Sequence, residues 1–340
     1  MSQAKKILVV GPSWVGDMVM AQSLFMVLKQ QMPTALIDVL APGWTIPLLD
    51  RMPEVNQGIE MIVGHGKLMI NERKTVAKKL SLENYDQAIL LPNSLKSALI
   101  PFWAGIPRRT GFLGEIRFFL VNDRIKLDKK QLTMTVQRFV SLGLPKDSVL
   151  PEKIPQPKLQ ISKASVEQSL NKYNINQPDK TLIALCPGAE YGPAKQWPLE
   201  HFASVANHYI EQGCHVWIFG SEKDVLAGQK INELTQQRCL DFTGKTSLSE
   251  AIDFMSLSSV VVSNDSGLMH VAAALDKHII AIYGSSDPKF TPPLSDKSHI
   301  LSLELSCSPC FKRECPLGHL ECLKELMPSL VIEQIDESIV

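Results

Sequence analysis

The sequence predicts an α/β protein made of two doubly wound domains. Its 340 residues are enough for about two domains of average size. Short apolar runs typical of buried strands alternate with amphipathic stretches of helical period, which is the pattern of βαβ units with parallel sheets. Residues 144–160 interrupt this alternation with four prolines and no helical period, which predicts a linker. We therefore expect one domain over residues 1–155 and another over 156–340, each Rossmann-like.

The individual elements follow from hydrophobic periodicity. In the first domain, strands are predicted at 6–10, 35–41, 59–62 and 86–91, with helices near 18–31, 69–82 and 95–103. In the second domain, helices are predicted at 163–173, 198–211, 223–237, 248–256 and 267–275, with strands at 181–186, 214–219, 239–242, 259–263 and 278–283. Near 329–339, Val331, Ile335 and Ile339 recur at helical spacing. In such sheets ligands bind at the carboxyl ends of the strands, so the chemistry is expected in the loops that follow them.

The charge is balanced over the whole chain but not within its halves. The chain has 35 Lys and Arg and 35 Asp and Glu, which argues against a dedicated nucleic-acid binder, and its composition excludes collagenous and disordered classes. Residues 1–150 hold 19 basic and 12 acidic residues, a net charge of +7, which leaves −7 for the remainder. This asymmetry is either a fluctuation or the mark of an anionic partner at the first domain.

The first residues and the cysteines indicate a cytoplasmic protein. The apolar run at 7–10 is too short for a signal peptide, and no stretch approaches the roughly 18 apolar residues that span a bilayer. Seven cysteines, an odd number, do not suggest a disulfide framework. Work at a membrane surface remains compatible with these features.

The loop after the first predicted strand combines glycines with an acidic residue. G-P-S-W-V-G-D at 11–17 approaches the fingerprint G-x-G-x-x-G, but Ser13 stands where a glycine would let the backbone approach a pyrophosphate. This disfavours NAD(P) binding. Asp17 falls in the first turn of the next helix, where a carboxylate either complements the helix dipole or acts as a general base. Trp14 is suited to line a sugar-facing or lipid-facing wall.

Two loops of the second domain carry charged residues directly after strands. P-G-A-E-Y-G-P-A-K-Q-W-P at 187–198 contains Lys195, which is either a solvated surface lysine or a point charge for a diphosphate. F-G-S-E-K-D at 219–224 contains Glu222, which either binds a ribose diol or belongs to a helix N-terminus.

A third loop of this domain begins a helix of small residues, in N-D-S-G-L-M-H-V-A-A-A-L at 264–275. The backbone N–H groups of Ser266, Gly267 and Leu268 would form an anion site at the helix N-terminus. His270 lies one turn into the helix, as either a structural or a binding residue.

Taken together, these segments resemble the bacterial lipopolysaccharide heptosyltransferases of glycosyltransferase family 9. The resemblance covers nearly the whole chain and includes R-M-P-E-V at 51–55, L-P-N-S-L-K-S-A-L at 91–99 and A-G-I-P-R-R-T-G at 104–111. It implies a GT-B fold, in which two Rossmann-like domains face each other across a cleft, with the acceptor on the first and the donor nucleotide on the second. It also implies transfer of L-glycero-D-manno-heptose from ADP-heptose to the first heptose of the lipopolysaccharide inner core, with inversion and without a required cofactor.

The resemblance assigns roles residue by residue. Asp17 matches the proposed base and Lys195 the diphosphate-binding lysine, so both are catalytic candidates. The expected donor-binding residues are Lys195, Glu222, Asp265, Ser266, Gly267, Leu268 and His270. The implied acceptor, heptosyl-octulosonate-lipid A, is anionic and lipid-anchored, which accounts for the basic first domain and places the enzyme at the cytoplasmic face of the inner membrane. The expected acceptor-binding residues are Ser13, Trp14, Lys96, Arg108, Arg109 and Arg117.

Two alternatives remain open. One is another sugar transferase of the same family, for example one that adds the first heptose. The other is a nucleotide-binding protein that transfers no sugar, either an NAD enzyme or a regulatory sugar-nucleotide binder, which Ser13 disfavours.

The remaining motif is a cluster of four cysteines, Cys307, Cys310, Cys315 and Cys322, with a histidine inside it. These are enough ligands for tetrahedral zinc, but the spacing lacks two paired C-x2-C units. A structural zinc, a redox or buried-thiol role and plain packing are therefore all compatible with the sequence, and we expect no metal to be required.

Overall fold

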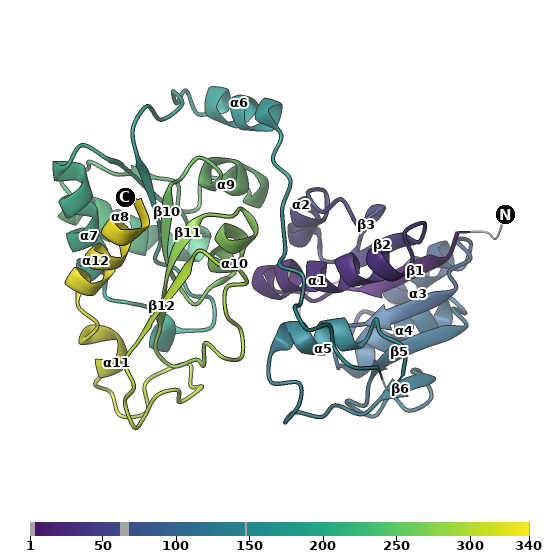
Figure 1. Cartoon of the computed structure of the whole chain (residues 1–340). Coiled ribbons are helices and arrows are strands. Elements are labelled where there is room, and N and C mark those ends of the chain that lie inside the picture. The colour runs from purple at the N-terminus through teal and green to yellow at the C-terminus, as the bar shows by residue number, and fades with distance from the viewer. Residues whose placement is uncertain (1–3, 62–67, 147, 340) are drawn as a thin grey trace. The chain divides into compact units, whose positions relative to one another are not determined.

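The computed structural model describes residues 4–61, 68–146 and 148–339, and the chain divides into two compact units. Unit 1 is Met1–Pro157 and unit 2 is Lys158–Val340. The division falls just beyond the expected boundary after residue 155, within the proline-rich segment. Each unit is built on a six-stranded sheet with helices packed on it (Figure 1). In the described ranges, none of the helices is long and apolar enough to cross a bilayer.

The sheet of unit 1 is entirely parallel and has the strand order of a Rossmann fold. Its strands, in the order in which they pair, are β3 (Gln57–Glu60), β2 (Leu36–Ala41), β1 (Lys6–Val10), β4 (Gln87–Leu90), β5 (Arg108–Phe112) and β6 (Asp123–Ile125). Its helices are α1 (Val15–Gln31), η1 (Gly43–Thr45), α2 (Ile46–Leu49), α3 (Ile70–Leu80), α4 (Leu95–Trp103) and α5 (Thr135–Ser141). The predicted strand at 59–62 corresponds to β3, and its last residue lies outside the described residues.

Helix α1 is buried on more than one side, which explains why its sequence is apolar almost all round. Most of its residues between Gly16 and Leu28 are buried, and it packs against α5 and the turn that follows. At that turn, a Cβ on Gly143 would lie only 2.4 Å from Leu24 Cδ1. The first turn of α1, which carries Asp17, therefore belongs to a helix that is buried over most of its length.

Unit 2 repeats the same sheet order with its own strands. They pair in the order β12 (Ser298–Ser302), β11 (His278–Tyr283), β10 (Val260–Asn264), β7 (Leu182–Cys186), β8 (His215–Ile218) and β9 (Leu240–Asp241). The helices are α6 (Lys163–Lys172), η2 (Pro193–Lys195), α7 (Leu199–Glu211), η3 (Glu222–Asp224), α8 (Val225–Leu234), α9 (Leu248–Met255), α10 (Gly267–Ala274), α11 (Glu321–Lys324) and α12 (Pro328–Ile339).

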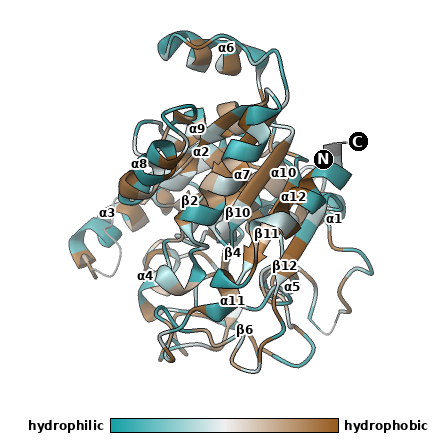
Figure 2. Cartoon of the chain, turned by 90° about the vertical axis from the view of Figure 1, so that its left-hand side faces the viewer, coloured by the Kyte–Doolittle hydropathy of each residue, from teal (hydrophilic) through white to brown (hydrophobic). Residues whose placement is uncertain are grey.

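The core of unit 2 lies between its sheet and the helices α7 and α12. The central strands are hydrophobic along their length, and the helices show apolar and polar sides (Figure 2). Val331 and Ile335 of α12 are completely buried in this core, which confirms the helix predicted from their spacing. The side chain of Ile339 lies outside the described residues.

The elements that sequence periodicity missed are short or polar. Strand β5 begins with two arginines, β6 has three residues, and β12 is a partly exposed edge strand. Such strands carry no alternating or continuous apolar run, and their pairing depends on the neighbouring strand rather than on their own sequence.

The packing of α12 predicts that Ile335 and Leu330, two side chains of equal size on this helix, contribute very differently to the free energy of unfolding. Ile335→Ala should lower the free energy of unfolding by about 2–4 kcal/mol, because it removes buried groups and leaves a cavity. Leu330, which is 41% exposed, is the matched control, and Leu330→Ala should cost less than about 0.5 kcal/mol. Urea denaturation followed by circular dichroism measures both, and equal losses would contradict the packing described for α12.

Candidate functional site

The predicted donor-binding residues of unit 2 gather around the point where its strand order reverses. Strands β7 and β10 are neighbours at the centre of the sheet, and the chain continues from them toward opposite edges. The loop after β7 carries Lys195, and Asp265 directly follows β10. Ligands of open α/β sheets bind at this position, outside the carboxyl ends of the strands.

Lys195 and Asp265 form an ion pair at this point. Both side chains are largely buried. The Ser286 hydroxyl donates a hydrogen bond to the same carboxylate oxygen, and the lysine ammonium lies 5.1 Å from the centroid of the Tyr191 ring. The ammonium is therefore held in one place by a carboxylate and an aromatic face.

The loop that carries Lys195 is closed by the side chain of Asn264, which is completely buried at the end of β10. Its amide nitrogen donates to Pro187 O at 2.6 Å, and its amide oxygen accepts from the backbone N of Trp197 at 3.0 Å. Trp197 is buried in turn, and its indole nitrogen donates to Leu326 O at 2.8 Å. One asparagine thus ties both ends of the loop to the strand that precedes Asp265.

The N-terminus of α10 presents backbone N–H groups beside this ion pair. Ser266 occupies the N-cap position in an extended conformation, and its side chain makes no capping hydrogen bond to the helix in the described structure. Ser266, Gly267 and Leu268 are partly exposed. An anion can therefore reach the free N–H groups at the positive end of the helix dipole.

His270 lies one turn further along α10 and is buried. Burial lowers the pKa of its imidazole to about 4, although the nearby Asp265 carboxylate opposes that shift. The side chain is consequently neutral at pH 7, and it can serve as a hydrogen-bonding group but not as a positive charge.

Glu222 lies where three loops, each containing a glycine, pack closely against one another. It is exposed at the start of η3, after β8. A Cβ on Gly188 would lie 2.5 Å from the Asp224 carboxyl carbon, and one on Gly220 would lie 2.7 Å from Asp224 Cβ. Gly244 has φ of +67° and packs against the backbone of Glu222. The sequence analysis assigned no role to these glycines, although each falls in the loop that follows one of three successive strands.

In unit 1, Asp17 also lies where the strand order reverses. Strands β1 and β4 are neighbours at the centre of that sheet, and α1 starts after the loop that follows β1. Asp17 is partly exposed in the first turn of α1. A carboxylate here meets the positional requirement of a base at the carboxyl edge of a sheet.

Aromatic side chains surround the loop that precedes Asp17. Trp14 is the N-cap residue of α1 and is about half exposed. Trp44, which the sequence analysis did not single out, is equally exposed, and its indole nitrogen donates to Ser13 O at 2.9 Å. Two accessible indoles therefore belong to this loop and its direct neighbour, which suits contact with sugar faces.

The predicted acceptor-binding cations do not all lie with Asp17. Lys96 is partly exposed in the first turn of α4, after β4. Arg108 and Arg109 instead begin β5, so they lie at the amino edge of the sheet, opposite Asp17. Arg108 is paired with Asp123 at 2.8 Å, and Arg109 Nε donates to Leu120 O at 2.7 Å.

Arg117 is buried and its guanidinium is used inside the protein. It donates to Pro92 O at 2.8 Å, to Phe112 O at 2.7 Å and to Asn93 Oδ1 at 3.1 Å. The loop after β5 is thereby fixed to the loop after β4. The structure places Arg117 as a positioning residue rather than as a contact for an external anion.

The four clustered cysteines are free thiols that line one small cavity of about 20 Å³. Burial and the proximity of the other three thiols raise the pKa of Cys322. Among the described residues, no group of three or more His, Cys, Asp or Glu side chains could hold a metal ion. The four side chains are present as free thiols, and the proposed chemistry uses none of them.

This cysteine segment supports the loop that carries Lys195. The backbone N of Ala194 donates to Arg313 O at 3.0 Å, and a Cβ on Gly192 would lie 2.6 Å from the same oxygen. Ala194 also lines the cavity of the thiols. Packing between two loops is therefore a function of this segment that the structure shows directly.

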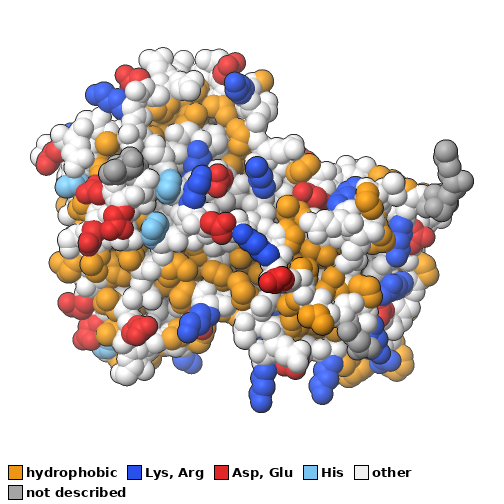
Figure 3. All heavy atoms as spheres, in the orientation of Figure 1, with side chains coloured by type: hydrophobic (Ala, Val, Ile, Leu, Met, Phe, Trp, Pro, Cys, Tyr) orange, Lys and Arg blue, Asp and Glu red, His pale blue; other side chains and the backbone are white. Residues whose placement is uncertain are grey.

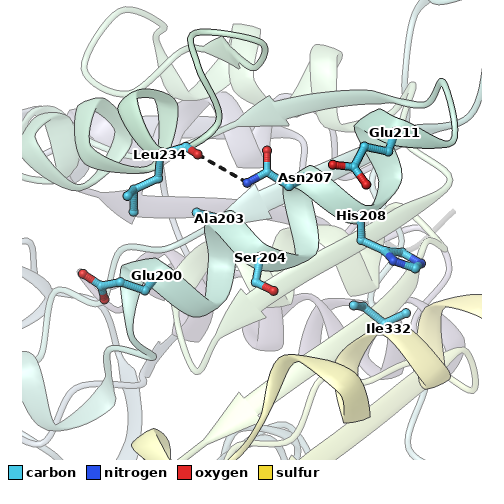
Figure 4. A pocket seen from close by; sticks show the side chains of 8 residues that line it. All are labelled: Glu200, Ala203, Ser204, Asn207, His208, Glu211, Leu234 and Ile332. Carbon is cyan, nitrogen blue, oxygen red and sulfur yellow. Dashed lines mark hydrogen bonds between the residues drawn. The ribbon is translucent and has the colours of Figure 1, made fainter.

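A larger hollow of about 450 Å³ lies elsewhere, between α7, α12 and the end of α8 (Figure 4). Asn207 and His208 of α7 line it together with Ile332, and Asn207 donates to Leu234 O at 3.3 Å. None of the predicted site residues lines it. Its size alone does not make it a candidate for the chemistry.

Comparison with known proteins defines the class of the chain. The model of glycosyltransferase family 9 (heptosyltransferase) matches residues 73–321. The lipopolysaccharide heptosyltransferase 2 of Escherichia coli K12 is 44% identical, with 97% of each chain covered. The lipooligosaccharide heptosyltransferase 2 of Haemophilus influenzae is also 44% identical, with 97% of this chain and 98% of that one covered.

A solved structure described as E. coli ADP-heptose lps heptosyltransferase II superimposes with a TM-score of 0.88 at 41% identity, over 98% of both chains. The fold and these matches define a glycosyltransferase of the GT-B type. The chain belongs to glycosyltransferase family 9. This confirms the family and the fold predicted from the sequence motifs, and it rules against a nucleotide-binding protein that transfers no sugar.

The burial of His270 predicts a pH-dependent stability. In the unfolded chain its pKa is near 6.5, while in the folded chain it is about 4. Between these values the unfolded state binds more protons, so the contribution of His270 is complete above pH 6.5 and is lost as the pH falls toward 4. His270→Gln should therefore reduce the loss of stability over this range, by up to about 3 kcal/mol.

Urea denaturation at several pH values between 4.5 and 7 measures this effect. His208→Gln, at a partly exposed histidine of α7 that lines the hollow of Figure 4, is the control. If both substitutions flattened the pH profile equally, the effect could not be assigned to the buried imidazole beside Asp265.

Proposed function

We propose that the chain transfers L-glycero-D-manno-heptose from ADP-heptose to the first heptose of the lipopolysaccharide inner core, with inversion at the anomeric carbon. The observation that carries this proposal is the 44% identity, over 97% of each chain, to a protein named lipopolysaccharide heptosyltransferase 2. The site geometry agrees with it, because unit 2 offers a cation and a helix N-terminus and unit 1 offers a carboxylate.

In this proposal, unit 2 binds the donor. The diphosphate of ADP-heptose contacts Lys195 and the N–H groups that begin α10, and both stabilise the negative charge that grows on ADP as it leaves. Glu222 binds the ribose hydroxyls at the rim of the glycine loops. His270 and Asp265 complete the pocket, the former as a neutral hydrogen-bonding group. No cofactor is required, since the lysine and the helix dipole supply the stabilising charge.

Unit 1 binds the acceptor. Asp17 removes the proton from the attacking hydroxyl, and this hydroxyl displaces ADP from the opposite face of the anomeric carbon in a single step. Ser13 and Trp14 line the acceptor sugars, and Trp44 and Lys96 extend this contact. Arg108 and Arg109 have no part in acceptor binding here, because they lie at the opposite edge of the sheet. Arg117 has none because it is buried. The acceptor is membrane-anchored, so the enzyme works in the cytoplasm against the inner face of the inner membrane.

The defining experiment incubates the purified chain with ADP-heptose and lipopolysaccharide acceptors truncated to different inner-core lengths. We expect a mass increase of one heptose only on the acceptor that already carries the first heptose. Transfer to the acceptor without any heptose would instead make the chain a transferase for the first heptose, and no transfer at all would contradict the proposal.

Replacing the proposed base separates chemistry from binding. Asp17→Asn should lower turnover by about 100-fold or more, the size expected for the loss of a general base, while ADP affinity stays near that of the unchanged protein. Asp50→Asn, at an exposed aspartate after α2, is the matched control. Initial rates and calorimetry measure the two effects, and normal turnover of Asp17→Asn would rule out its role.

Replacing Lys195 should weaken binding of the donor nucleotide. Lys195→Gln should weaken ADP binding about tenfold or more, because the diphosphate loses a largely buried cation. Lys223→Gln, in the next loop and mostly exposed in an ion pair with Glu190, is the control and should bind ADP normally. Isothermal titration calorimetry with ADP decides, and equal affinity of both variants would contradict the assignment of Lys195.

A further inference from the structure

The loop after β5 exposes large apolar side chains that no part of the proposed chemistry uses. We call residues 113–119 the apolar loop. In it Ile116 is 84% exposed and Phe119 is 91% exposed, and Leu113 and Phe118 are about half exposed. Together these side chains form an exposed apolar patch. Soluble proteins normally expose such a patch only where they bind another molecule or a membrane.

The apolar loop is anchored at its centre. Arg117 points inward, with its guanidinium on the carbonyl oxygens of Pro92 and Phe112. The backbone N of Leu120 and that of Val121 both donate to Arg117 O, at 3.0 and 3.1 Å. The inward direction of this one side chain leaves its neighbours on either side exposed, so their exposure is built into the fold of the loop.

Basic residues lie next to the apolar loop, at the same edge of the sheet. The loop leaves the carboxyl end of β5, where the backbone N of Leu113 donates to Ile125 O at the end of β6. Lys126, Lys129 and Lys130 follow β6 and are exposed. Figure 3 shows hydrophobic and basic side chains interspersed on the part of unit 1 that holds β5 and β6.

Apolar side chains beside lysines match one kind of surface in particular. A bilayer with anionic headgroups attracts lysines at its surface and accepts aromatic and aliphatic side chains below the headgroups. A purely apolar partner would leave the lysines unmatched, and a purely anionic one would leave Ile116 and Phe119 in water.

We propose that the apolar loop and the lysines after β6 dock unit 1 onto an anionic lipid bilayer, with Ile116 and Phe119 inserted below the headgroups. The inference rests on the proposed function, whose acceptor is anchored in such a bilayer, and it names the part of the chain that meets the membrane. The apolar loop and Asp17 both follow carboxyl ends of strands in one sheet, so a docked loop keeps the proposed base on the membrane-facing edge of that sheet.

The test measures co-sedimentation of the full chain with vesicles. Vesicles of phosphatidylethanolamine with about one third phosphatidylglycerol should bind the unchanged chain, and neutral phosphatidylcholine vesicles should bind it about tenfold less or weaker. The double variant Ile116→Ser, Phe119→Ser should lose about tenfold or more of the partition coefficient on the anionic vesicles. The double variant Lys129→Glu, Lys130→Glu should lose a similar factor.

Leu82→Ser provides the matched control, because Leu82 is 78% exposed after α3, before the amino end of β4. It should bind vesicles like the unchanged chain. All variants should keep the melting temperature of the unchanged chain, since the replaced side chains are exposed. Equal sedimentation of the Ile116→Ser, Phe119→Ser variant and the unchanged chain would overturn the proposal.

The proposal would also be overturned if the unchanged chain bound no vesicles, or if it formed dimers that the Ile116→Ser, Phe119→Ser variant abolished, since the apolar loop would then meet a second copy. Vesicle binding requires no sugar transfer. Binding without transfer of heptose would therefore contradict the proposed function alone, and transfer without any vesicle binding would contradict the docking surface alone.

Discussion

The hydrogen bonds of the buried Asn264 amide are the constraint on which the candidate donor site depends. This side chain joins Pro187 at one end of a long loop to Trp197 at the other, and both contacts start from the last residue of β10. The ammonium of Lys195 can stay beside Asp265 because the loop is held at both ends. A buried amide with both of its groups paired is costly to disturb, since either loss leaves an unsatisfied polar atom.

Both units have the same sheet order, and the candidate residues of each unit lie at the equivalent place in its sheet. In each unit the residue proposed for chemistry follows a central strand at the point where the strand order reverses, Asp17 after β1 in one and Lys195 after β7 in the other. The two positions differ in charge, a carboxylate in the first and a cation with a helix N-terminus in the second. This division matches a reaction in which one substrate loses a proton and the other loses an anion.

The sequence predicted most of the fold, because buried parallel strands and packed helices have clear apolar patterns. It did not predict β5 and β6, which are too polar or too short to show such a pattern. It also assigned Arg117 to the acceptor, because the first domain is basic and the implied acceptor is anionic. The backbone carbonyl oxygens that Arg117 contacts instead leave no trace in sequence.

The sequence motifs included Gly188 and Gly220 near Glu222, but they gave no reason for a glycine at either position. Their requirement comes from close contacts with Asp224 and with the backbone, and these arise only when three loops meet. Motif resemblance supplied the residues proposed for the donor side, and the structure added the contacts that hold these residues in place.

Because Lys195 is already paired with Asp265, an anion that binds the lysine must replace the carboxylate as its partner. If the diphosphate of the donor binds Lys195 as we propose, it competes with the Asp265 carboxylate, which already contacts the ammonium and accepts a hydrogen bond from Ser286. Part of the attraction is therefore offset by the separation of an existing pair, and the net affinity reflects the difference between two similar interactions. In the proposed reaction this balance would favour release of ADP after transfer, because the Asp265 carboxylate can pair with the lysine again.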